Sequence, residues 1–229
     1  IAEITCLADL CAAEPPAPTL ALADGTLVLW VLEERSAEWQ RRKVTAYLDQ
    51  MARIRRAGAS LAAFTSRPRR GEVTRLLHLA SLGGDAGRAQ DTPGELEHLP
   101  DRVLFENLPP GARSAIFISP AEISQTYYVP EGHEVCFFYL NVAEAGYEPV
   151  IARVELPAWV AQDPERLALT HAGIVAQARI TGDYPYVLAR ADELAFITGQ
   201  EREAFEEMVV TAMLRAGLRP ALSPKQYYK

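Results

Sequence analysis

Two apolar runs of strand length constrain the fold of this chain most strongly. Residues 135–142 read VCFFYLNV, and residues 150–156 read VIARVEL. Only a short connection separates the two runs, so they are expected to pair as antiparallel strands. Residues 20–32, 60–65 and 114–119 are predicted to form further strands. A sheet of this kind must bury its apolar faces under other elements.

Helical patterns supply those other elements. Segments with helical spacing of apolar residues or with helix-start signals lie at 2–13, 36–57, 72–82, 164–178, 184–197 and 200–216. The predicted architecture is therefore α/β, with one mixed sheet flanked by helices. The 229 residues suit a single domain spanning 1–229. Residues 83–94 are rich in glycine, aspartate and polar side chains, which indicates a mobile loop within that domain.

Composition narrows the class of protein. No apolar run reaches the roughly 18–20 residues that span a bilayer, and the first residues lack the features of a signal peptide. The three cysteines form no metal-binding pair, which is typical of reduced thiols in a cytoplasmic protein. The net charge of −7 argues against a nonspecific coat on nucleic acid. Because the chain has no initiator methionine, it is expected to begin inside a longer gene product.

A carboxylate inside an apolar strand segment is the first candidate for chemistry. Asp24 interrupts the run at 20–32, where burial of a charge is costly unless it is paired or bound to a cation. The following Gly25 lets the backbone bend, so Asp24 can project from the end of a strand. Asp-Gly is also a common hairpin turn, which is the structural alternative. Hydrolysis of a phosphodiester needs a divalent cation held by several oxygens, so Asp24 needs companions.

Two carboxylates and a tyrosine are candidate companions. Glu3 lies on the predicted first helix, which can fold back beside the strand that carries Asp24. Asp192 lies eight residues after Tyr184 in one predicted helix, so both can point at one site. The alternative for each carboxylate is a solvated charge on a helix surface.

The basic residues and the absence of established motifs say less about function than these carboxylates do. Arg67, Arg69 and Arg70 form a small cluster after a predicted strand, where they are either solvated or contact phosphate. The four histidines show no metal-binding spacing, and no serine-hydrolase elbow, P-loop or dinucleotide fingerprint is present.

Several unusual strings occur together along almost the whole chain. They are ALADGTLVLW (21–30), PGARSAIF (110–117), VCFFYLNV (135–142), IARVELPAWV (151–160), GDYPYVLARADELAFI (182–197), ER (201–202) and the terminal SPKQYYK. In these strings and in their order the chain resembles the NurA nuclease family. The resemblance implies an RNase H-like fold and a homodimer. It also implies a manganese-dependent 5′→3′ exonuclease with single-strand endonuclease activity, which works with the hexameric HerA translocase in the resection of double-strand-break ends.

The resemblance also implies roles for particular residues. Asp24 matches the second acidic strand position of the family, and Glu3 matches its helical glutamate. Tyr184 matches the tyrosine of the family's GYP segment. Lys225 matches the lysine of a C-terminal S-x-K element, where it is expected to contact phosphate.

Two departures from the family pattern qualify this expectation. Asp192 stands where the family usually has histidine, which keeps an oxygen ligand but changes charge and metal preference. The family's first Asp-Gly-Ser strand, expected before Glu3, is not in this sequence.

The resulting hypothesis is hydrolysis of DNA with one or two Mn²⁺ ions, or Mg²⁺, held by Asp24, Glu3 and Asp192, with Tyr184 orienting water or phosphate. One alternative is a catalytically weak subunit that docks on a HerA-type motor and guides DNA. Another is an RNase H-like domain used for an unrelated interaction.

Overall fold

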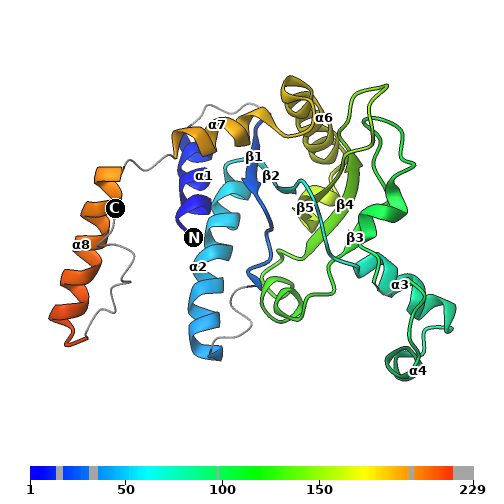
Figure 1. Cartoon of the computed structure of the whole chain (residues 1–229), viewed down its shortest axis with the longest axis horizontal. Coiled ribbons are helices and arrows are strands. Elements are labelled where there is room, and N and C mark those ends of the chain that lie inside the picture. The colour runs from blue at the N-terminus through cyan, green and yellow to red at the C-terminus, as the bar shows by residue number, and fades with distance from the viewer. Residues whose placement is uncertain (14–17, 31–35, 97, 196–198, 219–229) are drawn as a thin grey trace, which may run out of the picture. The chain divides into compact units, whose positions relative to one another are not determined.

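The apolar runs of the chain form a mixed β-sheet (Figure 1). The computed structural model describes residues 1–13, 18–30, 36–96, 98–195 and 199–218. Its five strands are β1 (Leu20–Asp24), β2 (Ser60–Thr65), β3 (Phe117–Ile118), β4 (Val135–Asn141) and β5 (Ile151–Pro157), in the spatial order β1-β2-β5-β4-β3. β1 and β2 are parallel, and the other neighbours are antiparallel. The predicted α/β class with a mixed sheet flanked by helices is confirmed.

The two strongest apolar runs behave as expected. β4 and β5 pair antiparallel along their whole length, from Val135 opposite Pro157 to Asn141 opposite Ile151. Every residue of both strands is buried. A strand that is covered on both faces needs apolar side chains on both, which explains why the runs are continuous rather than alternating.

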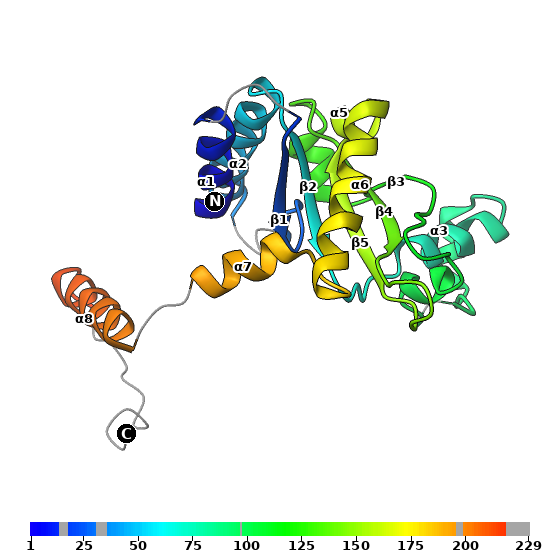
Figure 2. The same ribbon diagram turned by 90° about the horizontal axis from the view of Figure 1, so that it is seen from above.

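Helices cover both faces of the sheet (Figure 2). α1 (Ala2–Ala13) and α2 (Ala37–Arg56) pack on one face, and α5 (Ala158–Ala161) and α6 (Pro164–Thr181) lie on the other. Successive side chains of β1 point to opposite faces. Accordingly Ala21 and Ala23 join the apolar cluster under α1 and α2, whereas Leu22 joins the cluster under α6.

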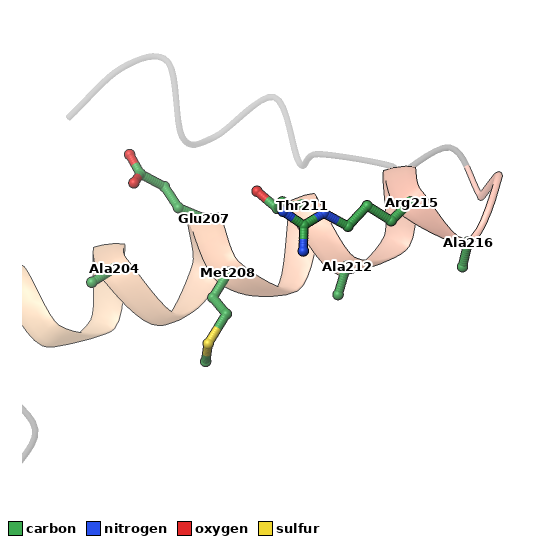
Figure 3. Close-up of a pocket in the computed structure, with 7 residues that line it drawn as sticks. All are labelled: Ala204, Glu207, Met208, Thr211, Ala212, Arg215 and Ala216. Atoms are coloured by element: carbon green, nitrogen blue, oxygen red, sulfur yellow. The ribbon is translucent and has the colours of Figure 1, made fainter.

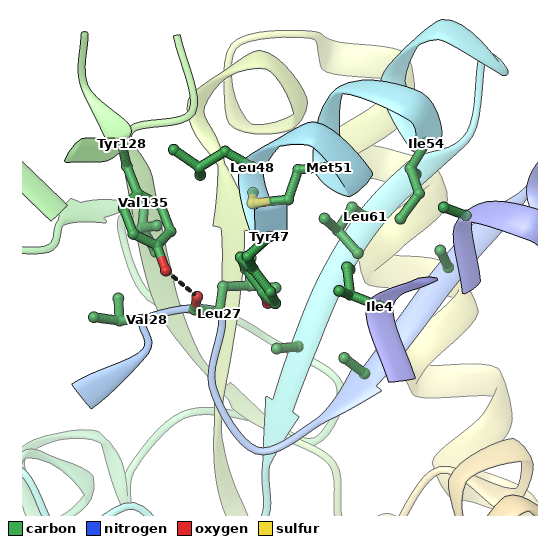
Figure 4. Packing of buried hydrophobic residues seen from close by; sticks show 14 of the residues in the cluster. Ile4, Leu27, Val28, Tyr47, Leu48, Met51, Ile54, Leu61, Tyr128 and Val135 are labelled. Atoms are coloured by element: carbon green, nitrogen blue, oxygen red, sulfur yellow. Dashed lines mark hydrogen bonds between the residues drawn. The ribbon is translucent and has the colours of Figure 1, made fainter. Parts of the chain in front are cut away.

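The cluster under α1 and α2 also fixes the chain that follows β1 (Figure 4). Tyr128 comes from η3 (Ser124–Tyr128), a short π-helical turn, and its ring is fully buried. Its hydroxyl donates to the carbonyl of Leu27 at 3.0 Å and accepts from the amide of Leu29 at 3.2 Å. Burial raises the pKa of this hydroxyl, so it stays protonated and keeps donating. The segment after Asp24 is therefore held by the core.

Two predicted strands are shorter than expected. The strand predicted at 20–32 ends at Asp24, because Gly25 takes a positive φ of 90° and the chain leaves the sheet there; residues 31–35 lie outside the described part. The strand predicted at 114–119 is reduced to Phe117–Ile118. Ser114 is the reason, since its hydroxyl, rather than a backbone carbonyl, accepts the amide of Tyr139 at 3.0 Å.

Among the described residues, three short helices follow β2 in the sequence, before β3. They are α3 (Glu72–Ser81), α4 (Ala86–Asp91) and the 3-10 helix η2 (Asp101–Phe105). The predicted loop 83–94 thus contains a short helix, capped by the Asp85 side chain at the amide of Arg88. The mobility of this segment stays a prediction.

The chain divides into two compact units, residues 1–189 and residues 190–229. α7 (Tyr186–Leu194) runs across the division, and α8 (Gly199–Arg215) belongs to the second unit. Figure 3 shows a hollow along α8, lined by Ala204, Glu207, Met208, Thr211, Ala212, Arg215 and Ala216. These residues come from α8 and the residue that follows it and include a single carboxylate, so they indicate no chemistry. No helix in the described ranges is long and apolar enough to cross a membrane.

The three cysteines differ in exposure, which gives a first prediction. Cys6 is exposed, whereas Cys11 and Cys136 are buried. Burial, with the nearby charge of Glu134, raises the pKa of the Cys136 thiol to about 11, and burial raises that of Cys11. Because the thiolate is the reactive form, we expect one thiol to react rapidly with a disulfide reagent at pH 8, and all three to react after unfolding in urea. Rapid reaction of all three in the folded chain would contradict this packing.

Candidate active site

The site is built around Asp24, at the carboxyl end of β1. The middle of β1 is buried, but Asp24 itself is exposed. Gly25 donates its amide to the carbonyl of Phe64 at 2.8 Å and accepts from the Thr65 hydroxyl at 2.6 Å, so the turn is tied to the end of β2. No hairpin forms at Asp24-Gly25, because β1 pairs within the described residues only with β2. The carboxylate therefore projects from the end of a strand, as predicted.

Glu3 lies beside Asp24. It occupies the first turn of α1, where a negative charge is favoured by the helix dipole. Its Oε1 accepts the backbone amide of Asp24 at 3.3 Å, across 21 residues of sequence. Both residues are exposed. Packing of α1 against β1 thus brings two acidic side chains to one place.

Tyr184 reaches the same place from the far end of the chain. Its hydroxyl donates to Oδ1 of Asp24 at 2.9 Å. Its ring meets Phe64 of β2 edge to face, with centroids 5.5 Å apart and an interplanar angle of 83°. Tyr184 precedes α7, contrary to the helix predicted from 184, because a residue before a proline is disfavoured in helical conformation and Pro185 follows it. The ring and hydroxyl contacts fix the tyrosine over the strand ends.

Two of the predicted site residues fall in the second unit or outside the described residues. Asp192 is exposed on α7 and belongs to the second unit, whereas Asp24 belongs to the first. Lys225 lies outside the described residues. The first unit thus brings together Glu3, Asp24 and Tyr184, and the roles of Asp192 and Lys225 stay predictions.

The arginine cluster after β2 is divided by the structure. Arg67 and Arg69 are exposed and line a cavity that Tyr184 also lines. Arg70 is engaged instead, with its guanidinium 3.4 Å from the ring centroid of Trp30 and 4.0 Å from a Glu72 carboxylate oxygen. Of the three, Arg67 and Arg69 are the better placed for a ligand near Asp24.

A buried ion pair behind the site was not anticipated from the sequence. Glu155 of β5 accepts from the Thr26 hydroxyl at 2.7 Å and from the Leu27 amide at 2.8 Å. Its other oxygen accepts from Nε of Arg153 at 2.9 Å, and both side chains are 3% exposed. Glu155 thereby anchors the two residues after the Asp24-Gly25 turn. The signal in the sequence was the pair of charges in IARVELP, an otherwise apolar strand.

The chemistry of the acidic pair suits a hard divalent cation. Among the residues whose placement is described, no group of three or more aspartate, glutamate, histidine or cysteine side chains is arranged to hold a metal. Magnesium-type ions are nevertheless often bound by one or two carboxylates, with water and substrate phosphate completing the coordination. Glu3 and Asp24, exposed and adjacent, fit that requirement.

A comparison with family models decides the family. The model of the NurA domain matches residues 7–197, which is most of the chain. The chain belongs to the NurA family. NurA proteins are nucleases associated with DNA end processing, and the match includes Asp24, Tyr184 and Asp192. Glu3 and Lys225 lie outside the matched range. Neither the comparison with curated proteins nor the comparison with solved structures gave a match, so the RNase H-like fold stays a prediction.

Proposed function

We propose that this NurA protein hydrolyses the phosphodiester bonds of DNA with Mn²⁺, or with Mg²⁺ in its place, at the Asp24–Glu3 pair. One observation carries the proposal: two carboxylates and a tyrosine, from positions 3, 24 and 184 of the sequence, meet at the exposed end of β1. This is the arrangement that phosphodiester chemistry needs, in a family of nucleases. When bound, a divalent ion supplies a nucleophile near neutral pH and neutralises negative charge on the phosphate.

The side chains around the pair have distinct roles in this proposal. Asp24 and Glu3 hold the ion, and Asp192 is a further oxygen ligand that stands where the family usually has histidine. The Tyr184 hydroxyl donates a hydrogen bond to Asp24, which orients the carboxylate. Arg67 and Arg69 bind the phosphate backbone through their guanidinium groups, and Lys225 adds a further phosphate contact.

The cellular setting is proposed from the family. The protein acts as a 5′→3′ exonuclease and single-strand endonuclease in the resection of double-strand-break ends, as a cytoplasmic homodimer that works with a HerA-type translocase. These features rest on membership of the NurA family.

End-labelled single-stranded DNA tests the proposal. The strand is labelled at its 5′ end in one sample and at its 3′ end in another, and each is incubated with the chain and Mn²⁺. We expect loss of the 5′ label as a short product before the 3′-labelled strand disappears. Intact strands in both samples would overturn the proposal.

A second function has one observation in its favour. Among the described residues no group of three or more possible metal ligands comes together, so only two carboxylates meet at the end of β1. The alternative is a subunit that docks on a HerA-type motor and guides DNA without cutting it. Co-sedimentation with the motor, in a sample that leaves labelled DNA intact, is the result expected from this alternative. Cleavage by the isolated chain excludes it.

Substitution of Tyr184 tests the site itself. Tyr184→Phe keeps the ring on Phe64 but removes the hydroxyl that donates to Asp24. A hydrogen bond to a charged group contributes about 1.5–3 kcal/mol, so we expect cleavage to slow about tenfold or more, with little change in stability. Tyr186→Phe, at an exposed tyrosine two residues away, is the matched control and should leave the rate unchanged. Equal rates for the two variants would remove Tyr184 from the site.

A further inference from the structure

A cavity of about 640 Å³ lies next to the acidic pair, and it has a distinct charge pattern. Its wall includes Tyr184, whose hydroxyl donates to Asp24, so one side chain both lines the cavity and contacts the acidic pair. Three arginines line it, together with two carboxylates: Arg67, Arg69, Arg102, Glu106 and Asp183. Arg102 comes from η2 and was not singled out in the sequence, where it is one exposed arginine among many.

The three arginines have no acidic partner in the part of the chain that the structure describes. None of them lies within 4 Å of a carboxylate there, although Glu106 and Asp183 line the same cavity. Other arginines are engaged: Arg153 lies between two glutamates, for example. Three guanidinium groups around one cavity repel one another, and a bound anion relieves that repulsion. Each offers a planar set of donors that matches two oxygens of a phosphate.

The backbone that carries these arginines is well anchored. Arg67 and Arg69 follow the carboxyl end of β2, beside the carboxyl end of the parallel strand β1 that bears Asp24. Arg102 follows Asp101, a fully buried residue whose carboxylate accepts three backbone amides at the start of α3, at 2.8–2.9 Å. The Tyr139 hydroxyl donates to the same carboxylate at 2.8 Å. Because its neighbour is fixed in this way, the backbone at Arg102 is held in place beside the cavity.

We propose that this cavity is a second phosphate-binding subsite, which holds a backbone phosphate next to the one at Asp24, with Arg102 as a direct contact. The inference rests on the proposed function, because it takes the ligand to be a DNA strand that passes Asp24. The ligand class is the phosphodiester backbone, bound through charge and without reading of bases. Tyr184 separates the two phosphate positions, so the subsite sets how far the strand extends beyond the point of cleavage.

Binding in the absence of metal tests the subsite separately from cleavage. The full chain is titrated into fluorescent single-stranded oligothymidylate in EDTA, and anisotropy is followed at several KCl concentrations. We expect Arg102→Gln to weaken binding about five- to tenfold at low salt and to reduce the slope of log Kd against log salt by about 0.7, the value for one phosphate contact on a single strand. Arg102→Lys, which keeps the charge, should restore most of the slope.

Arg56→Gln is the matched control. Arg56 is also an exposed arginine, but it ends α2, near the start of β2 and so at the opposite end of that strand from Asp24. The proposal predicts wild-type binding for this variant. Wild-type binding by Arg102→Gln, or an equal loss in both variants, would overturn it. A chain that binds as proposed but never cleaves would contradict the proposed function alone, whereas a chain that cleaves while Arg102→Gln binds normally would contradict the subsite alone.

Discussion

Asp24→Asn is expected to reduce metal-dependent cleavage of single-stranded DNA by about 10³-fold or more. The substitution keeps the shape of the side chain and its ability to accept from Tyr184, but it removes the negative charge. A metal ion contributes several kilocalories per mole to such a reaction, and each 1.36 kcal/mol corresponds to about a factor of ten in rate. The rate is measured under single-turnover conditions with Mn²⁺, so that product release does not mask the effect.

The control for this variant is Asp49→Asn. Asp49 is an exposed aspartate on α2 with no place in the proposed site, and its substitution changes the net charge by the same amount. We expect its cleavage rate to match that of the wild type. If Asp24→Asn retained the wild-type rate as well, Asp24 would not hold the catalytic ion.

The largest effect on stability is expected for Arg153→Met. Arg153 is 2% exposed, and its guanidinium donates to Glu155 at 2.9 Å and to Glu72 at 3.1 Å. Burial alone lowers the pKa of Arg153, but Glu155, Glu72 and Tyr139 together raise it, so the group is charged. Its removal leaves Glu155, 3% exposed, without its cation, and leaves Glu72, 8% exposed, with only the Arg70 guanidinium 4.0 Å away. Breaking a buried ion pair in this way costs about 3–5 kcal/mol.

Urea denaturation measures this effect as the loss of free energy of unfolding. Arg53→Met serves as the comparison, because the Arg53–Asp9 pair between α1 and α2 is 35% and 62% exposed. Such pairs contribute at most about 1 kcal/mol, so the comparison variant should unfold close to the wild type. An Arg153→Met chain as stable as the wild type would show that the network around β5 does not stabilise the fold.

The sheet could be predicted from the sequence because burial on both faces leaves a strong local signal. The continuous apolar runs at 135–142 and 150–156 correspond to β4 and β5, with boundaries off by about one residue. Asp24-Gly25 indicated a bend in the chain, but the sequence did not predict that the strand ends there. The chain leaves the sheet there because Glu155 holds Thr26 and Leu27, and that contact depends on the register of β2 and β5.

The candidate site was only partly predictable, for a related reason. Glu3 beside Asp24 follows from a helix folding back on the next strand, which is a local relation. Tyr184 reaches Asp24 across 160 positions; helical spacing suggested it only together with Asp192, and the resemblance to the family matched it to the tyrosine of the GYP segment. Arg102 could not be identified from the sequence, because only the folded chain shows that this exposed arginine lines a cavity.

Restoration of activity by metal tests the central claim most directly. The purified chain is treated with EDTA, dialysed, and assayed on labelled single-stranded DNA while Mn²⁺ is added back in steps. If the chain is a metal-dependent nuclease with its ion at Asp24 and Glu3, we expect no cleavage before Mn²⁺ is added. Cleavage should then return and saturate as Mn²⁺ increases, and it should not return in Asp24→Asn. Cleavage that persists in EDTA, or that returns equally in Asp24→Asn, would contradict the account.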